Sequence, residues 1–329
     1  MLARIKKLST FAAMVATSAA ILAMWASAYS SHINPQHFGW YDILGMAFPI
    51  FVFINAAALI FWLIFKPKLA LIPLFGFLCC LSDLKTYCPL NIPQNPPQGS
   101  LKIMSYNAHN FDGITKENKK EGKQQIIANI INSNADIVCI QEGDCWENWK
   151  QVEKKLHNYK YTEVLGQDSA PTTMRCFSKL KIIKAQQIAF PQSFNSAVAF
   201  FMKHPRGDTI IVLSNHLQSD NLTPEELKNY HALMKGKNEA GHKKSKTAIL
   251  SLFRKVALAA EKRSTQVDSI ISFLNTHTNT PVILCGDFND TPISYSRREI
   301  ARNLTDAYVE TGFGPGFSYT SNGMRVRID

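Results

Sequence analysis

The stretch "ILCGDFNDTP" at residues 283–292 joins an apolar run to a cluster of polar side chains. The apolar residues lead directly into Gly-Asp-Phe-Asn-Asp, and a proline follows soon after. This pattern predicts a buried strand that ends in a turn. Asp287 and Asn289 are two residues apart, so their side chains face the same side of an extended chain. We therefore expect a rigid strand that holds an acid and an amide toward one place.

Three other apolar runs also end in a side chain that can bind a metal or a phosphate. They are residues 101–107, ending at Asn107, residues 136–142, ending at Glu142, and residues 209–217, which carry His216. In α/β sheets, binding sites lie beyond the strand ends, because the sheet fixes the side chains while the loops leave them accessible. Taken alone, each of these residues has a simpler interpretation, as a turn former, as the start of a helix or as a structural histidine. Four strand ends of the same character favour a shared site.

Amphipathic segments alternate with these apolar runs. Residues 123–134 and 263–277 carry apolar side chains at helical spacing, whereas the apolar runs are rich in β-branched residues. The alternation predicts an α/β fold for residues 101–329. We find no internal repeat.

The first hundred residues differ from the rest in having long runs without charge. Residues 8–29 and 43–65 each exceed or match the length of about 20 apolar residues that a bilayer requires, and residues 69–82 form a shorter third run. Buried core helices are the alternative, but uncharged runs of this length make it the weaker one. We expect residues 1–85 to form a membrane anchor with two to three transmembrane helices.

The loop charges predict an orientation for this anchor. Basic residues precede the first run at 4–7 and follow the second at 66–68, whereas residues 30–41 contain no Lys or Arg. The positive-inside rule then places the N-terminus in the cytoplasm and the soluble domain outside it. The expected protein is a multi-pass membrane protein. If the third run does not cross, the soluble domain is cytoplasmic.

Residues 86–100 are rich in Pro, Asn and Gln and predict an extended linker. The net charge of the 329-residue chain is +11, which favours a phosphate-bearing partner or an anionic membrane surface. A basic solvated surface is an equally good interpretation. The cysteines show neither a metal-binding spacing nor a disulfide framework, so they do not define the compartment.

Five short motifs occur in one order along the C-terminal part. They are "MSYN" (104–107), "IQE" (140–142), "NHLQS" (215–219), "GDFND" (286–290) and "RID" (327–329). This set resembles the endonuclease/exonuclease/phosphatase superfamily over about residues 101–329, including its membrane-anchored bacterial members. The resemblance implies a two-sheet α/β sandwich with four layers, as in deoxyribonuclease I. The segment 171–183 matches the family pattern only loosely.

The resemblance also implies roles for individual side chains. The metal ligands would be Asn107 and Glu142, the catalytic residues His216, Asp287, Asn289 and Asp329, and the substrate contacts Asn215 and Arg263. Carboxylate and amide oxygens suit a hard cation that keeps several waters, so Mg²⁺ is the expected cofactor, with Mn²⁺ as an alternative. Asp287 would orient or deprotonate the attacking water, and His216 would donate to a phosphate oxygen.

The expected function is metal-dependent hydrolysis of a phosphodiester or phosphomonoester. Nucleic acid, phospholipid and sugar phosphates all fit as substrates, so nuclease, phosphodiesterase and phosphatase activities stay open. The basic segment 235–263 predicts a strip for a nucleic-acid backbone or for anionic headgroups, with a solvated loop as the alternative. The expected partners are the lipid bilayer and the substrate, and no protein partner is inferred.

A second function from another class also fits the sequence. The family pattern continues beyond its Arg-Ile-Asp strand with a Ser-Asp-His motif, whereas this sequence ends at Asp329. The fold would then be incomplete at its C-terminus, and the histidine that Asp329 orients would be missing. A catalytically impaired, membrane-anchored binding domain is therefore the alternative. If another histidine replaces the missing one, His109, close after the first motif, is the candidate.

Overall fold

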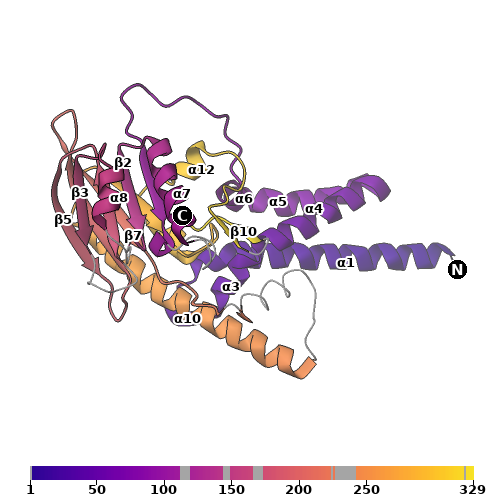
Figure 1. Cartoon of the computed structure of the whole chain (residues 1–329). Helices are drawn as coiled ribbons and strands as arrows, with labels where there is room; N and C mark the ends of the chain where they lie inside the picture. The colour runs from indigo at the N-terminus through magenta and orange to yellow at the C-terminus, as the bar shows by residue number, and fades with distance from the viewer. Residues whose placement is uncertain are drawn as a thin grey trace. The chain divides into compact units, whose positions relative to one another are not determined.

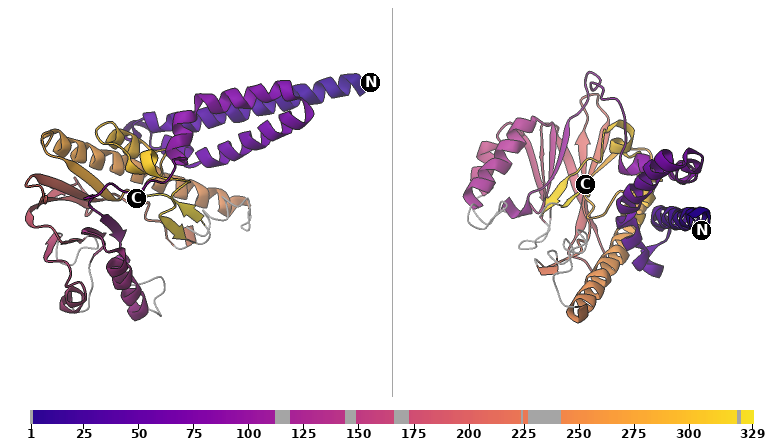
Figure 2. Two further views of the ribbon diagram at one scale, coloured as in Figure 1. Left: turned by 90° about the horizontal axis from the view of Figure 1, so that it is seen from above. Right: turned by 90° about the vertical axis from the view of Figure 1, so that its right-hand side faces the viewer.

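The computed structural model describes residues 2–111, 119–143, 149–165, 173–223, 225–226, 242–321 and 324–329. Contacts divide the chain into two compact units, each built from segments that are distant in the sequence (Figures 1 and 2). Unit 1 contains residues 1–93, 220–264 and 290–327, and unit 2 contains residues 94–219, 265–289 and 328–329.

Unit 2 is built on two four-stranded sheets. The first has the order β1-β2-β4-β3, from β1 (Ile103–Asn107), β2 (Ile137–Gln141), β3 (Tyr161–Leu165) and β4 (Met174–Ser178). The second has the order β5-β6-β7-β8, from β5 (Ile182–Ala189), β6 (Ser196–Lys203), β7 (Thr209–His216) and β8 (Val282–Asp287). Only the pairs β1–β2 and β7–β8 are parallel, and the other neighbours are antiparallel.

The alternation of side chains along β2 shows how these sheets form layers. Ile137 and Cys139 lie in one core with residues of the second sheet such as Phe200. Val138 and Ile140, on the opposite face, lie in another core with three isoleucines of helix α7 (Lys119–Ser133). The short helix α8 (Trp149–Lys155) adds to the same outer layer.

The outer face of the second sheet is covered by the C-terminal part of α10 (His242–Asn275). The rings of Phe201 on β6 and Phe273 on α10 are 6.5 Å apart, and Val267 and Ile270 are fully buried. Unit 2 is therefore a helix–sheet–sheet–helix arrangement. The prediction of a two-sheet α/β sandwich is confirmed.

A buried glutamine joins the two sheets close to the strand ends. Gln141 Nε2 donates to Ser214 Oγ on β7 at 2.9 Å and to Ser105 Oγ on β1 at 3.2 Å. In the parallel registers, Asn107 pairs with Gln141, and His216 pairs with Asp287. The carboxyl ends of both parallel pairs are thus brought to the same edge of the sandwich.

Unit 1 contains the apolar helices of the N-terminal region. Two helical stretches, Arg4–His32 and Phe48–Phe65, are long and apolar enough to cross a membrane. They belong to α1 (Leu2–Tyr29) and α4 (Phe48–Phe65). The third run is broken, because the segment 67–79, which ends in α5 (Leu71–Cys79), and α6 (Leu81–Tyr87) meet at a bend of 65°. Taken together, the two parts have the length and composition of a broken span or of a re-entrant segment.

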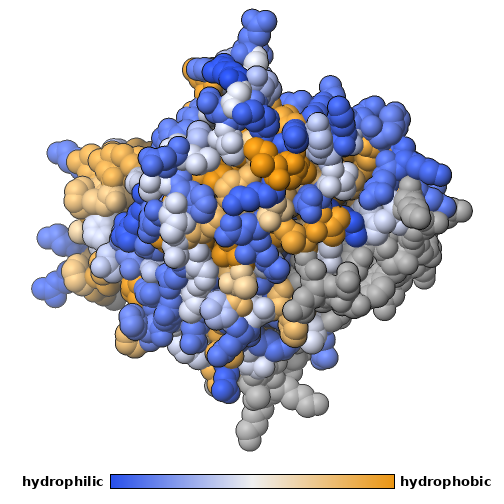
Figure 3. Space-filling model, turned by 90° about the vertical axis from the view of Figure 1, so that its left-hand side faces the viewer, coloured by the Kyte–Doolittle hydropathy of each residue, from blue (hydrophilic) through white to orange (hydrophobic). Residues whose placement is uncertain are grey.

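Polar side chains within these helices bond to neighbouring helices. Trp62 Nε1 donates to Thr17 Oγ1, Asn55 Nδ2 to the carbonyl of Ala20, and Trp25 Nε1 to the carbonyl of Gly76, each at 3.0 Å. Such internal partners are what polar groups require in a lipid environment. Large apolar side chains on the same helices stay exposed, which fits contact with lipid; they include Leu8, Phe53, Ile64 and Phe65. Figure 3 shows another face of the molecule, on which hydrophilic and hydrophobic side chains are interspersed.

The remaining elements of unit 1 are short. They are η1 (Ser30–His32), α2 (Pro35–Phe38), α3 (Trp40–Met46), η2 (Pro67–Ala70), α11 (Tyr295–Ala301), α12 (Ala307–Thr311), β9 (Tyr319–Ser321) and β10 (Met324–Val326). A Cβ added at Gly39 would lie 2.6 Å from the carbonyl oxygen of Ala257 on α10. The segment between α1 and α4 therefore lies directly against α10.

The predicted linker is attached to unit 1 at its beginning. Leu90 forms an isolated β-bridge with Phe313, and Asn91 Nδ2 donates to the carbonyls of Val309 and Gly312 at 3.0 Å. Unit 1 combines the predicted anchor with part of the predicted linker and parts of the predicted soluble domain. The compact units therefore do not follow the predicted domain bounds, which stay a prediction.

Candidate functional site

Two carboxylates of unit 2 converge on one amide. Asn107 Nδ2, at the end of β1, donates to Glu142 Oε1 and to Asp287 Oδ2, each at 2.9 Å. Glu142 directly follows β2 and Asp287 ends β8, so three different strands supply the group. The structure therefore brings together the two predicted metal ligands and the predicted catalytic aspartate.

His216 lies beside this group at the end of β7. Its Nε2 is 3.6 Å from Glu142 Oε1, and its side chain is 7% exposed. Burial lowers the pKa of His216, although the charges of Glu142 and Asp329 oppose the shift. The ring is therefore neutral near pH 7. Its buried Nδ1 has no hydrogen-bond partner among the described residues.

The turn after β8 is held by short hydrogen bonds. The backbone N–H of Asn289 donates to Asp287 Oδ1 at 2.9 Å, and Asn289 Nδ2 donates to the carbonyl of Leu217 at 2.9 Å. Asn289 thus joins the end of β8 to the end of β7. A Cβ at Gly286, where φ is 144°, would overlap the backbone of Asn215, so this position requires glycine.

Glu142 and Asn289 both have backbone angles in the left-handed region. Glu142 has a φ of 47° and Asn289 a φ of 50°. The left-handed region is unfavourable for a residue such as glutamate, and such strain is found preferentially at functional sites. The strained backbone supports the view that the position of Glu142 is determined by function rather than by local stability.

His109 also reaches Glu142. It belongs to the 3-10 turn η3 (His109–Phe111), and its Nδ1 is 3.3 Å from Glu142 Oε2. Its backbone N–H donates to Asn107 Oδ1 at 3.0 Å. Its side chain is 78% exposed, so it can contact a ligand from solvent. The sequence signal for His109 was only its place two residues after Asn107.

The predicted substrate contacts of Asn215 and Arg263 receive no support from the structure. Asn215 is fully buried and donates through Nδ2 to the carbonyl of Asp287 at 3.4 Å. Arg263 is 1% exposed, and its guanidinium is bonded to three carboxylates. Neither side chain is accessible to a substrate, because residue type and order along a chain do not reveal burial.

The last residues of the sequence approach the same turn of unit 2. The backbone N–H of Phe288 donates to the carbonyl of Ile328 at 2.9 Å, and the charge of Asp329 acts on His216. Asp329 therefore belongs to the electrostatic surroundings of the candidate site. The roles assigned to Asn289 and Asp329 stay predictions.

The donor set at this site fits a hard cation. Burial alone would raise the pKa of Glu142, but the hydrogen bonds from His109 and Asn107 outweigh it and lower the pKa. Glu142 is therefore ionised at neutral pH. The two carboxylates offer oxygen donors of the kind that a hard divalent cation uses, whereas the Asn107 amide, whose Nδ2 faces both of them, would have to turn to offer its oxygen. Among the described residues, no group of three or more His, Cys, Asp or Glu side chains is arranged to hold a metal ion.

Comparison with known families agrees with this arrangement. Residues 104–329 match the model of the Endonuclease/Exonuclease/phosphatase family. The chain belongs to this family. The match begins at Met104 on β1 and includes all four strand ends of the site. Membership in the family supports hydrolysis of phosphate esters as the class of reaction. Residues 8–87 match a second model, described as a domain of unknown function (DUF8431).

No curated protein matches the chain. Among solved structures, truncated TDP2 of Caenorhabditis elegans is 16% identical, with a TM-score of 0.39 over 63% of this chain and 69% of that one. ANGEL2, a 2',3'-cyclic phosphatase, is 16% identical, with a TM-score of 0.41 over 69% and 63%. A family protein of Bacteroides thetaiotaomicron is 13% identical, with a TM-score of 0.38 over 61% and 68%. Similarity of this degree assigns no activity.

Proposed function

We propose that this family member is a divalent-metal-dependent phosphoesterase that its N-terminal helices hold at a membrane. The observation that carries the proposal is the convergence of Glu142 and Asp287 on Asn107, with His216 beside them. This places two carboxylates, an amide and a neutral imidazole at one edge of a rigid sandwich. The group is suited to a phosphoryl centre, whose transfer depends on positioning and on charge neutralisation.

Each side chain has a defined part in this proposal. Glu142 and Asn107 would hold Mg²⁺, with Mn²⁺ as an alternative, and the ion would neutralise charge on the phosphoryl oxygens. Asp287 orients a water and accepts its proton as the new P–O bond forms and the ester P–O bond breaks. His216 donates to a non-bridging oxygen, and the exposed His109 can supply the proton that the leaving oxygen requires.

The substrate class follows only in part from these groups. Nucleic acid, phospholipid and sugar phosphates all present the same phosphoryl centre, and selectivity depends on loops. Residues 235–241, the first part of the predicted basic strip, lie outside the described residues, and the rest of it belongs to α10. Nuclease and phosphatase activities are therefore equally compatible with the proposed site.

Metal dependence is the first test. We expect the full chain, purified in detergent, to hydrolyse bis-p-nitrophenyl phosphate only with Mg²⁺ or Mn²⁺, because the carboxylates at the site need a cation before an anionic substrate can bind. Chelator should abolish the activity, and added metal should restore it. Glu142→Gln should raise the metal concentration required for half-maximal rate, measured by titration.

A matched control for this titration is Asp208→Asn. Asp208 is exposed in the turn before β7, at the opposite end of that strand from His216. Its substitution should therefore leave the metal response unchanged. Full activity in excess chelator would contradict the proposal. Substrate binding without turnover at any metal concentration would favour the impaired binding domain instead.

The location of the site is a separate proposal. Loop charges place residues 30–41 and the domain after residue 100 outside the cytoplasm. Reporter fusions at residues 40 and 100 should then both report export. Because the third apolar run is bent at Cys80, the fusion at residue 100 is the informative one. A cytoplasmic signal there would make the bent run a re-entrant segment.

A further inference from the structure

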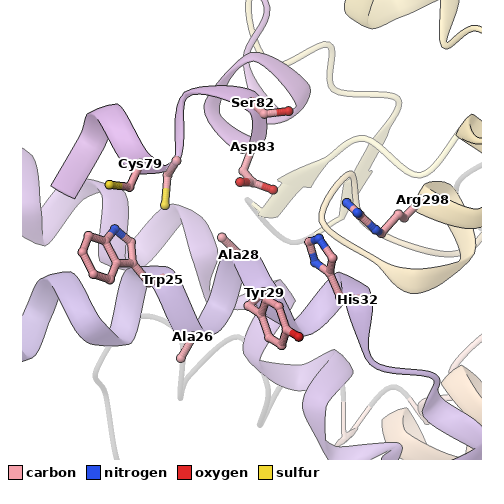
Figure 4. A pocket seen from close by; sticks show the side chains of 10 residues that line it. Trp25, Ala26, Ala28, Tyr29, His32, Cys79, Ser82, Asp83 and Arg298 are labelled. Carbon is pink, nitrogen blue, oxygen red and sulfur yellow. The ribbon is translucent and has the colours of Figure 1, made fainter. Parts of the chain in front are cut away.

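Unit 1 contains a pocket of about 680 Å³ at the end of its apolar helices. Trp25 and Tyr29 of α1, His32 of η1, Cys79 of α5, Asp83 of α6 and Arg298 of α11 contribute to its lining (Figure 4). No residue of the candidate phosphoesterase site belongs to this pocket. It is therefore a separate feature with its own chemistry.

The lining has an apolar and a polar part. Trp25, Ala28 and Cys79 come from the apolar helices, whereas His32, Asp83 and Arg298 carry ionisable groups. In Figure 4, the side chains of these three residues point toward one another across the pocket. A ligand that fills the pocket would meet charge at one end and apolar surface at the other.

Arg298 makes no ion pair or side-chain hydrogen bond with any described residue, and its Nε is buried. The two neighbouring arginines differ in this respect. Arg297 Nε and Nη2 both bond to Asp306, at 2.9 and 2.8 Å, and Arg302 bonds to Glu299 at 2.7 Å. A buried unsatisfied N–H of a charged group is costly. The buried Nε–H of Arg298 therefore points to an anionic ligand as the missing acceptor.

Asp83 supplies the opposite charge in the same pocket. Its carboxylate interacts electrostatically with His32 and Arg298, but it forms no salt bridge with either. One carboxylate and one guanidinium that stand near each other without pairing match a ligand that carries both charges. A ligand with negative charge alone would be repelled by Asp83.

We infer that this pocket binds the headgroup of a zwitterionic aminophospholipid. The phosphate lies on Arg298, the ammonium lies on Asp83, and the acyl chains lie along α1 and α5 next to Trp25. The candidate span that runs from α1 into η1 ends at His32, so the polar part of the pocket is at the depth of lipid headgroups. Tryptophan and tyrosine are also the side chains typical of that depth. The inference rests on the proposed membrane insertion but not on the proposed catalysis.

The test uses the full chain reconstituted in vesicles of phosphatidylcholine, phosphatidylethanolamine and phosphatidylglycerol in equal parts. After extraction in mild detergent, native mass spectrometry counts the retained lipid. We expect phosphatidylethanolamine to be retained selectively. Arg298→Gln should reduce its retention by about tenfold or more, since a hydrogen bond to a charged group is worth about 1.5–3 kcal/mol. Arg302→Gln, which alters an exposed arginine of the same region, should change nothing.

Asp83→Asn provides an independent readout. Without the carboxylate, the preference should move from phosphatidylethanolamine toward phosphatidylglycerol, a change that general unfolding cannot produce. Equal retention of the three lipids by the unchanged chain would overturn the inference. Soluble phosphoethanolamine that displaces the lipid at equal concentration would also overturn it, because the pocket would then recognise a free phosphate ester and not a lipid.

Discussion

Replacing Asp287 with asparagine should lower the turnover of a phosphodiester by about 10²–10⁴-fold, which is the usual contribution of a positioned acid–base group. Asparagine keeps the size of the side chain, and its Oδ1 can still accept the hydrogen bond from the backbone of Asn289. The turn after β8 should therefore keep its shape. What is lost is the negative charge that would accept the proton of water, together with the hydrogen bond that Asp287 Oδ2 accepts from Asn107 Nδ2. Steady-state kinetics at saturating metal measure the effect.

The separation of kcat from KM makes this result specific. A group that acts on the attacking water should lower kcat with little change in KM. Asp208→Asn, at the other end of β7, serves as the control for a lost surface charge. If Asp287→Asn binds metal and turns over substrate as the wild-type chain does, Asp287 is not part of the mechanism. His109 would then be the base to examine.

The fold of unit 2 and the centre of its site could be predicted because both follow from local patterns. Short apolar runs rich in β-branched residues defined β2 and β8, and a polar side chain directly after such a run lies at the strand end. Asn107, Glu142 and Asp287 were predicted in this way. Parallel pairing of β1 with β2 brings Asn107 and Glu142 together, whereas Asp287 reaches them because the second sheet packs against the first.

Other features depend on contacts that no local pattern contains. Arg263 has a partner, Asp42, that lies 221 positions away in the sequence. Nothing near either residue indicates the other, so Arg263 was interpreted as a substrate contact. The break in the third apolar run at Cys80 likewise occurs without a proline or glycine at that position. Residue type alone reveals neither burial nor long-range pairing, and the role of Arg263 as a substrate contact stays a prediction.

Arg263 is the centre of a buried ionic cluster in unit 1. Its guanidinium reaches Asp220 at 2.9 Å, Asp290 at 3.2 Å and Asp42 at 3.3 Å. These aspartates come from the segment after β7, from the turn after β8 and from α3 between the first two apolar helices. One cation therefore holds together three segments that are far apart in the sequence.

Arg263→Leu should destabilise unit 1 by about 3–5 kcal/mol, because removing one member of a buried ionic group leaves the others without compensation. Thermal unfolding of the full chain in detergent measures this as a lower Tm. Arg302→Leu is the control, since Arg302 forms an exposed ion pair with Glu299, and such pairs contribute about 0–1 kcal/mol. A normal Tm in Arg263→Leu with a raised KM would instead restore the predicted substrate contact.

The same cluster predicts a dependence of stability on pH. Burial raises the pKa of Asp42 to about 8, the charge of Asp290 adds to the shift, and Arg263 opposes it. Three carboxylates share one guanidinium, so Asp42 keeps its proton in the folded state. Its contribution to stability is complete below its ordinary pKa of 3.8 and is lost as the pH rises through about 8.

Asp42→Asn removes this titration, because the amide resembles the protonated acid and cannot ionise. The Tm of Asp42→Asn should therefore rise relative to the Tm of the wild-type chain as the pH increases from about 5 to about 9. Asp208→Asn, whose carboxylate is exposed, should show no such shift. A Tm difference that stays constant over this range would mean that Asp42 is already ionised in the folded cluster. Arg263 would then neutralise it in the folded state.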